Sequence, residues 1–229
     1  MSAQGKYISD NIKKENLSMK DDKIIITVGR QIGSGGRTIA KILSEQFHCS
    51  FYDKEILNLA AKESGLCEKF LEKNDEHKGF FGSLLHFQMA FISGSNTYEG
   101  TNLQEQIYQF QSDVIRKAAE KGNCVFVGRT ADYLLRDHKS IVNIFITAFP
   151  ETRVERVCKR MNINSEAARK YVKEQEHERA SYYNFYTGKK WGFSTSYDLC
   201  INSSILGIKG TADYIAEFIK QRFKCKMEE

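Results

Sequence analysis

Residues 24–40 read IIITVGRQIGSGGRTIA: a run of β-branched residues, then a glycine-rich turn, then the start of an amphipathic pattern. The run Ile24–Val28 predicts a fully buried strand. Apolar residues between positions 39 and 47 recur at close to helical spacing and predict a helix directly after the turn. A strand, a glycine-rich turn and a helix in succession can hold phosphate, because the turn's amides face inward and the helix N-terminus adds about half a positive charge.

The turn itself supplies the candidate phosphate ligands. We expect the phosphates of a ligand to bind six residues, Gly33, Ser34, Gly35, Gly36, Arg37 and Thr38. The Thr38 hydroxyl is the candidate contact to a phosphate-bound Mg²⁺ ion. The pattern departs from the usual Gly-x-x-x-x-Gly-Lys-Ser/Thr loop, because no lysine lies in the turn. Arg37 is therefore the candidate source of positive charge, with Arg30 and Lys41 as alternatives.

Two other interpretations of the turn remain open. One is a tight structural turn, although four glycines in eight residues exceed what such a turn needs. The other is dinucleotide binding, since Gly33-x-Gly35 begins that fingerprint and Asp53 lies where a ribose-binding carboxylate would fall. Against dinucleotide binding, position 38 holds threonine where a third glycine is needed.

The rest of the chain alternates strands with helices. Further strands are predicted near residues 49–52, 124–127, 141–147 and 197–202, and helices near 54–64, 103–121, 150–161, 165–181 and 211–223. This alternation predicts an α/β fold with a parallel sheet covered by helices on both faces. We expect a flexible tail at 1–22, one domain at 23–229, and a mobile or acceptor-side insert at 66–102.

The composition favours a soluble protein. The 229 residues are 41% hydrophobic and 28% charged, and no apolar run approaches the ~18 residues that a membrane helix needs. The six cysteines are scattered without Cys-x-x-Cys spacing, as expected for free thiols in a reducing compartment. The net charge of +5 is modest and suits a small anionic ligand better than nucleic acid. We therefore expect a cytoplasmic protein without a membrane partner, and leave homo-oligomerisation open.

Several segments together resemble the cytidylate-kinase-like family of P-loop proteins. They are Val28–Ala40, Phe51–Glu55, Val127–Asp132, Asn143–Thr147 and Tyr197–Asn202, in the order expected for that family. The resemblance implies a three-layer P-loop NTPase fold with a mostly five-stranded parallel sheet, a helical insert and a lid near 160–195. It also implies ATP-dependent, magnesium-assisted transfer of the γ-phosphoryl group to a small acceptor, with CMP as the first candidate.

Arginines are the candidate groups for neutralising charge on a migrating phosphoryl group. Arg129 follows a strand at the sheet edge where ligands bind in open α/β folds, and by resemblance it contacts the acceptor nucleotide. Arg153 and Arg156 share one helix face, which fits the start of a lid over the donor phosphates. Arg179 lies on the next helix, and Asp53 could hold an acceptor hydroxyl or a magnesium-bound water.

Each of these residues also has a simpler interpretation. Arg129 could be an ordinary surface arginine, and Arg153 and Arg156 could belong to a solvated face paired with nearby glutamates. Asp132 could bind a ligand or only cap the next helix. At the level of function, the missing lysine leaves open a catalytically inactive nucleotide-binding regulator. The basic and aromatic stretch 179–191 leaves open a nucleic-acid-binding module.

Overall fold

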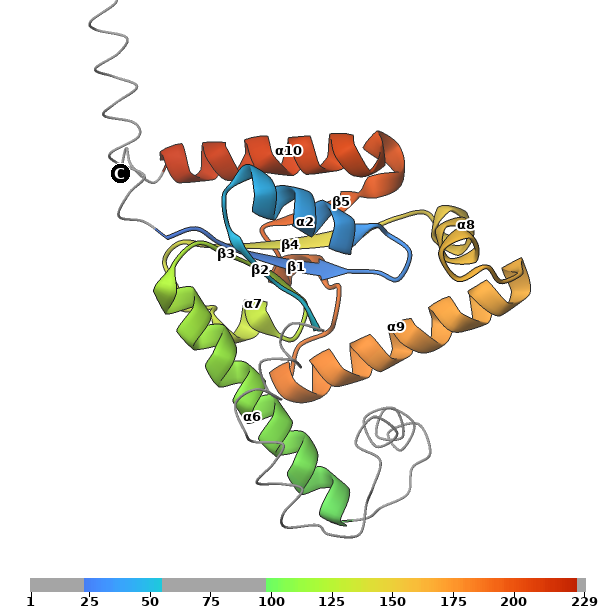
Figure 1. Ribbon diagram of the computed structural model, residues 1–229, viewed down its shortest axis with the longest axis horizontal. Helices are drawn as coiled ribbons and strands as arrows, with labels where there is room; N and C mark the ends of the chain where they lie inside the picture. Colours follow the sequence, from blue (N-terminus) through green and yellow to red (C-terminus); the bar gives the residue numbers. More distant parts are fainter. Residues whose placement is uncertain (1–22, 55–97, 226–229) are drawn as a thin grey trace, which may run out of the picture.

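The computed structural model describes residues 23–54 and 98–225 (Figure 1). The predicted tail at 1–22, nearly all of the predicted helix at 54–64 and most of the predicted insert at 66–102 lie outside the described residues. Within the described ranges, none of the helices combines the length and the hydrophobicity that crossing a bilayer requires.

A five-stranded parallel sheet forms the centre of the molecule. Its strands are β1 (Ile25–Arg30), β2 (Ser50–Tyr52), β3 (Cys124–Val127), β4 (Ile141–Thr147) and β5 (Leu199–Asn202), in the spatial order β2-β3-β1-β4-β5. Every neighbouring pair is parallel. β1 lies in the middle because its first four residues are buried on both faces, as the β-branched run predicts. The predicted α/β fold with a parallel sheet is confirmed.

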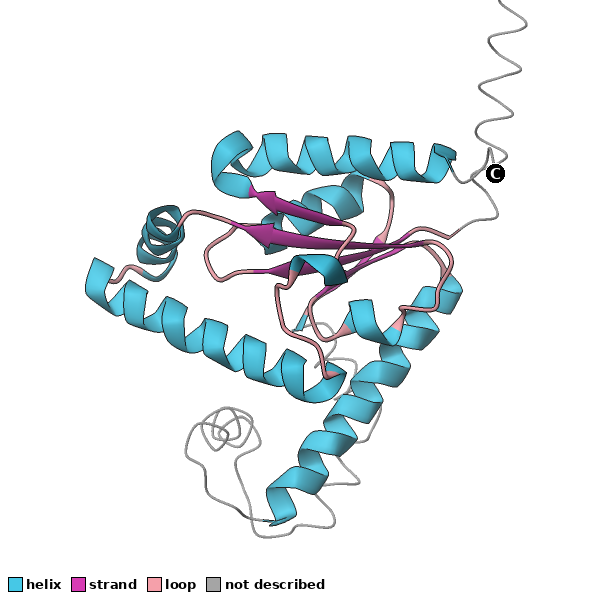
Figure 2. Ribbon diagram, turned by 180° about the vertical axis from the view of Figure 1, so that it is seen from behind, coloured by secondary structure: helices cyan, strands magenta, loops and turns pink. Residues whose placement is uncertain are grey.

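Helices cover both faces of the sheet (Figures 1 and 2). On one face, α2 (Gly36–Gln46) and α10 (Ser203–Cys225) pack with the strands into the larger hydrophobic core. On the other face, α6 (Tyr98–Lys121) and α7 (Ala131–Leu134) pack against β1 and β3. Because the strands are parallel, all their carboxyl ends point to one edge, where the loops to α2 and α7 begin.

Two further helices form an arm beside that edge. α8 (Pro150–Met161) begins with proline at its first turn, and the Asn164 side chain caps α9 (Ser165–Thr187) by accepting a hydrogen bond from the Ala167 amide. Both starts agree with the sequence pattern. Figure 1 shows α9 running from α8 back towards α6, so that its C-terminal half lies below the sheet. A short 3₁₀ turn at Ser194–Ser196 then leads to β5.

The last helix begins earlier than the sequence predicts. The apolar periodicity indicates a start at Thr211, but α10 begins at Ser203, directly after β5. Gly207 interrupts it with a left-handed φ of 68°, which glycine adopts without strain. This kink separates a short first segment from the amphipathic remainder, and only the remainder carries the periodic signal.

Candidate functional site

The glycine-rich loop between β1 and α2 depends on residues without a Cβ. Gly33 and Gly35 both have left-handed φ angles, 76° and 77°. A Cβ on Gly33 would lie 2.5 Å from the carbonyl oxygen of Arg153, which is backbone and cannot easily move. The sequence at these positions therefore fixes both the turn and its close contact with α8.

The carbonyl oxygens of the loop are bound by donors from the surrounding helices. Arg153 Nε donates to the Ile32 oxygen at 2.9 Å and Arg156 Nη1 to the Gly33 oxygen at 3.3 Å. Ser203 Oγ donates to the Ser34 oxygen at 2.6 Å. With its carbonyls held from outside, the loop can direct amides towards a ligand on its inner side.

A buried ion pair anchors this arrangement. Arg153 Nη2 lies 2.8 Å from Glu176 Oε2, and only 9% of the Arg153 side chain is exposed. The other carboxylate oxygen of Glu176 accepts a hydrogen bond from the Ile32 amide at 3.2 Å. Arg153 and Glu176 thus connect α8 and α9 through both polar groups of Ile32. The structure brings Arg153 and Arg156 to the loop, where both donate to its backbone carbonyl oxygens.

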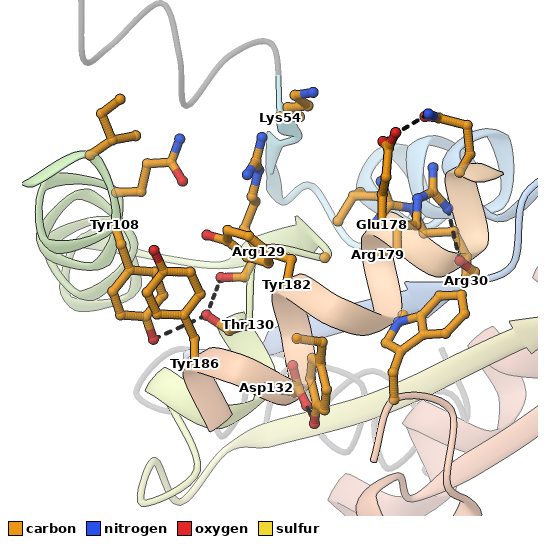
Figure 3. Close-up of a pocket in the computed structure, with 18 of the residues that line it drawn as sticks. Arg30, Lys54, Tyr108, Arg129, Thr130, Asp132, Glu178, Arg179, Tyr182 and Tyr186 are labelled. Carbon is orange, nitrogen blue, oxygen red and sulfur yellow. Dashed lines mark hydrogen bonds between the residues drawn. The ribbon is translucent and has the colours of Figure 1, made fainter. Parts of the chain in front are cut away.

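A pocket of about 280 Å³ opens beside the loop, at the carboxyl ends of β1 and β3 and between α6 and α9. Four cationic side chains line it: Arg30, Lys54, Arg129 and Arg179. In the view of Figure 3, Arg30 and Arg179 lie at one end of the pocket and Tyr108 and Tyr186 at the other. This end of a parallel sheet is where ligands bind in open α/β folds, so the pocket is the candidate active site.

Arg30 and Arg179 are both desolvated. Burial lowers the pKa of Arg30 well below its usual value, and the nearby charges of Arg179 and Arg129 lower it further. Burial also lowers the pKa of Arg179 to about 10, and Arg179 Nη1 donates to the Arg30 carbonyl oxygen at 2.9 Å. An anion that enters the pocket would stabilise these cations, because it compensates for the water that burial has removed from them.

Aromatic rings form the opposite wall. Tyr108 of α6 and Tyr186 of α9 stack with their centroids 3.8 Å apart. The Arg129 guanidinium lies over the Tyr182 ring, 5.3 Å from its centroid. The sequence pattern indicates α9 tyrosines in this region, but it misses Tyr108. The only sequence feature that points to Tyr108 as a site residue is its position directly after Ile107 on a predicted amphipathic helix.

Asp132 lies at the floor of the same pocket. Its Oδ2 accepts a hydrogen bond from the Tyr183 hydroxyl at 2.6 Å, and burial raises the pKa of the carboxyl group. Asp132 is in the first turn of α7, yet Thr130 is the N-cap residue and makes no side-chain capping bond. The carboxylate also accepts backbone hydrogen bonds at the start of α7, so Asp132 both lines the pocket and contributes to the N-terminus of that helix.

The remaining predicted residues are Arg37 and Thr38 at the start of α2, and Asp53, which directly follows β2. Arg37 is 63% exposed and binds the buried carboxylate of Asp53, with Nη2 2.6 Å from Oδ2. Neither residue lines the pocket. Thr38 is exposed on the first turn of α2. The structure thus joins Arg37 to Asp53, whereas Arg129 and Arg179 line the pocket.

The oxygen donors near the loop suit a magnesium ion better than a transition metal. Within residues 23–54 and 98–225, no group of three His, Cys, Asp or Glu side chains could bind a metal by itself. The Thr38 hydroxyl and the Asp53 carboxylate are hard oxygen donors. One or two such ligands fit Mg²⁺, which otherwise keeps waters and phosphate oxygens.

Curated proteins similar in sequence to this chain include several cytidylate kinases. The sequence profile of the cytidylate kinase-like family matches residues 25–205. A cytidylate kinase from Pyrococcus horikoshii is 30% identical over 190 residues, covering 81% of this chain and 83% of the relative. One from Methanocaldococcus jannaschii is 27% identical over 204 residues, covering 86% of this chain and 97% of the relative.

Solved structures agree with the fold. An uncharacterized protein from Eubacterium ventriosum superposes with a TM-score of 0.66 at 29% identity, over 86% of this chain and 99% of that protein. The protein TT1252 from Thermus thermophilus superposes with a TM-score of 0.53 at 17% identity, over 85% of this chain and 97% of that protein. The glycine loop, the parallel sheet and the extent of the family match together show that this chain belongs to the cytidylate kinase-like family.

Proposed function

We propose that the protein transfers the γ-phosphoryl group of ATP to a small phosphorylated acceptor, with CMP as the first candidate. The observation that carries this proposal is the pocket beside the glycine loop, which four cationic side chains line at the carboxyl edge of the sheet. The name shared by the Pyrococcus and Methanocaldococcus relatives supports CMP as the acceptor. A pocket next to a phosphate-binding loop lets donor and acceptor phosphates approach each other.

On the donor side, the loop 33–38 and the N-terminus of α2 would hold the ATP phosphates. Arg153 and Arg156 act from outside by holding the loop carbonyls. Arg37 stands at the exposed start of α2, where it could reach donor phosphates by exchanging its bond to Asp53. Thr38 would be the protein contact for Mg²⁺, which neutralises phosphate charge when bound.

On the acceptor side, Arg129 and Arg179 would bind the acceptor phosphate; that both line the pocket supports this role. The tyrosines of α6 and α9 offer flat surfaces for a nucleobase at the other end. Asp132 and Tyr183 supply polar groups at the floor of the pocket. The catalytic contribution would be positioning and charge neutralisation, which suffice for phosphoryl transfer.

α9 is the candidate lid. It links the loop, through Glu176 and Arg179, to the pocket wall, through Tyr182 and Tyr186. A shift of this helix on ligand binding would close the pocket and the loop together. Closing excludes water and so limits hydrolysis of ATP.

A coupled assay for ADP formation tests the proposal. ATP and Mg²⁺ are supplied with each of CMP, UMP, AMP, GMP and their deoxy forms. We expect turnover above the ATPase background with a pyrimidine nucleotide, highest for CMP. Tight ATP binding without turnover on any acceptor would contradict the kinase proposal and favour a regulatory nucleotide-binding protein.

A further inference from the structure

We propose that Arg30, the last residue of β1, is the phosphate-binding cation of this loop and serves where a lysine is absent from the turn. Its guanidinium would contact phosphate oxygens between the glycine loop and the acceptor pocket. This proposal rests on the proposed function for the identity of the anion. Arg30 lies outside the positions of the usual loop pattern. It is also distinct from Arg37, the exposed arginine at the start of α2.

The path of the Arg30 side chain is set by two glycines. A Cβ on Gly36, the first residue of α2, would lie 2.5 Å from Arg30 Cβ and 2.9 Å from Arg30 Cγ. A Cβ on Gly128, at the end of β3, would overlap Arg30 Nη1. The side chain therefore begins against the phosphate loop and ends against the strand that carries Arg129. Only a long side chain that crosses between these two glycines can reach both sides of the site.

The surroundings of the Arg30 guanidinium favour binding of an anion. Among the described residues, no carboxylate or carbonyl oxygen accepts a hydrogen bond from it. After burial, the charges of Arg179 and Arg129 lower its pKa most, while the charge of Asp53 raises it. A guanidinium presents several N–H donors in one plane, matched to phosphate oxygens. A desolvated cation beside other cations costs free energy until an anion binds.

The other two cations that the sequence offers for this role are placed differently. Arg37 is 63% exposed and bonded to Asp53 through both Nε and Nη2. Lys41 is 59% exposed and pairs with Glu45 on the solvent side of α2. Of the three, only Arg30 lines the pocket. The comparison selects Arg30 on geometry, and the excess of cations around its guanidinium is a second observation in its favour.

The test compares Arg30→Gln with wild type by calorimetric titration of ATP and of CMP. Glutamine keeps the Cβ and Cγ that lie against Gly36, and it removes the positive charge and the planar guanidinium group. We expect ATP affinity to fall about 10- to 100-fold, as for the loss of a charge-assisted contact. Arg30→Lys restores part of the affinity because it keeps the charge. The control Arg116→Gln, on the exposed side of α6, leaves affinity unchanged.

The melting temperature without ligand separates this role from a structural one. A phosphate-binding arginine among cations is destabilising in the empty pocket, so Arg30→Gln should melt at or above the wild-type temperature. A lower melting temperature together with wild-type ATP affinity would overturn the proposal. If Arg30→Gln does not fold, Arg30→Met takes its place, because it also keeps Cβ and Cγ and removes the charge. Wild-type affinity for ATP in that variant would also overturn the proposal.

The outcomes distinguish this proposal from the kinase proposal. Binding of ATP that depends on Arg30, with no turnover on any acceptor, would support Arg30 and contradict the kinase. Unchanged turnover and binding in Arg30→Gln would overturn the role of Arg30 and leave the kinase standing. A folded wild-type protein that binds neither ATP nor CMP would overturn both.

Discussion

Two sets of arginines surround the glycine loop, and they do different things. The outer arginines, Arg153 and Arg156, donate to loop carbonyl oxygens, and buried Arg153 also pairs with half-buried Glu176. The inner arginines, Arg30 and Arg129, line the pocket, where the described residues supply no carboxylate ion pair for either. Both sets consist of arginines, so their different roles depend on which groups accept their hydrogen bonds. Arginines whose donors are already bound by protein shape the loop, whereas those facing a cavity are suited to bind a ligand.

Arg179 belongs to neither set alone. It donates to the carbonyl oxygen of Arg30 like an outer arginine, and it lines the pocket like an inner one. Burial lowers its pKa to about 10, which still leaves it charged at neutral pH. Arg179 therefore links the position of α9 to the site.

The largest expected effect is on catalysis by an inner arginine. Arg129→Gln removes a charge from the pocket, and we expect kcat/KM for the acceptor to fall about 1,000-fold because charge stabilisation is lost in the transition state. Steady-state kinetics with ATP and CMP measure this. The folded state should survive, since Arg129 makes a cation–π contact with Tyr182 and no described ion pair. An unchanged kcat/KM would contradict the assignment of Arg129.

The next effect is on stability, through an outer arginine. Arg153→Met leaves the carboxylate of Glu176 without its cation and the Ile32 oxygen without its donor. We expect the free energy of unfolding to fall by about 3 kcal/mol, as when one partner of a buried pair is removed. Urea denaturation measures the change.

Arg169→Met is the matched control for Arg153→Met. Arg169 also connects α9 to α8, through Glu151, but both side chains of that pair are more than half exposed. We expect no measurable change in stability, because water screens an exposed pair. Equal losses of stability in the two variants would contradict the claim that burial of the ion pair determines the size of the loss.

A smaller loss of stability is expected from the loop itself. Gly33→Ala introduces a Cβ against the Arg153 carbonyl oxygen and retains an unfavourable left-handed φ. We expect a loss of about 2 kcal/mol in the free energy of unfolding. Gly122→Ala is the control, because a Cβ there meets no atom within 4 Å. A Gly33→Ala variant as stable as wild type would show that the loop can move away from α8.

The smallest effect concerns the pH dependence of stability at Asp132. Burial raises the pKa of this carboxyl group above 3.8, so the folded protein binds its proton more tightly than the unfolded chain. The group therefore contributes stability below pH 3.8 that is lost as pH rises through the folded-state pKa. Asp132→Asn removes this pH-dependent loss of stability, and its side-chain oxygen can still accept a hydrogen bond from the Tyr183 hydroxyl.

Thermal melts across the acidic and neutral range measure this dependence. The melting temperature of Asp132→Asn relative to wild type should increase with pH and then level off. A difference that is constant with pH would contradict the raised pKa of Asp132. A difference that decreases with pH would mean that the ionised carboxylate is favoured in the folded state.

The sequence predicts most of the fold because its signals are local. The buried strand at 25–30, the glycine turn and the capped start of α9 each depend on neighbouring residues. The partners of the arginines depend on contacts across more than one hundred residues, as between Arg153 and Ile32. Periodicity places Arg153 and Arg156 on one helix face, but it cannot show that the face packs on loop carbonyls. Tyr108 enters the site for the same reason, through the docking of α9 on α6.

Binding of CMP to the pocket tests the central claim most directly. Calorimetric titration of CMP into wild type, Arg129→Gln and Arg169→Gln compares an inner arginine with an exposed one in the same protein. The account predicts saturable binding to wild type and Arg169→Gln, and affinity at least about tenfold weaker for Arg129→Gln. Equal affinity in all three proteins, or no binding by folded wild type, would contradict it.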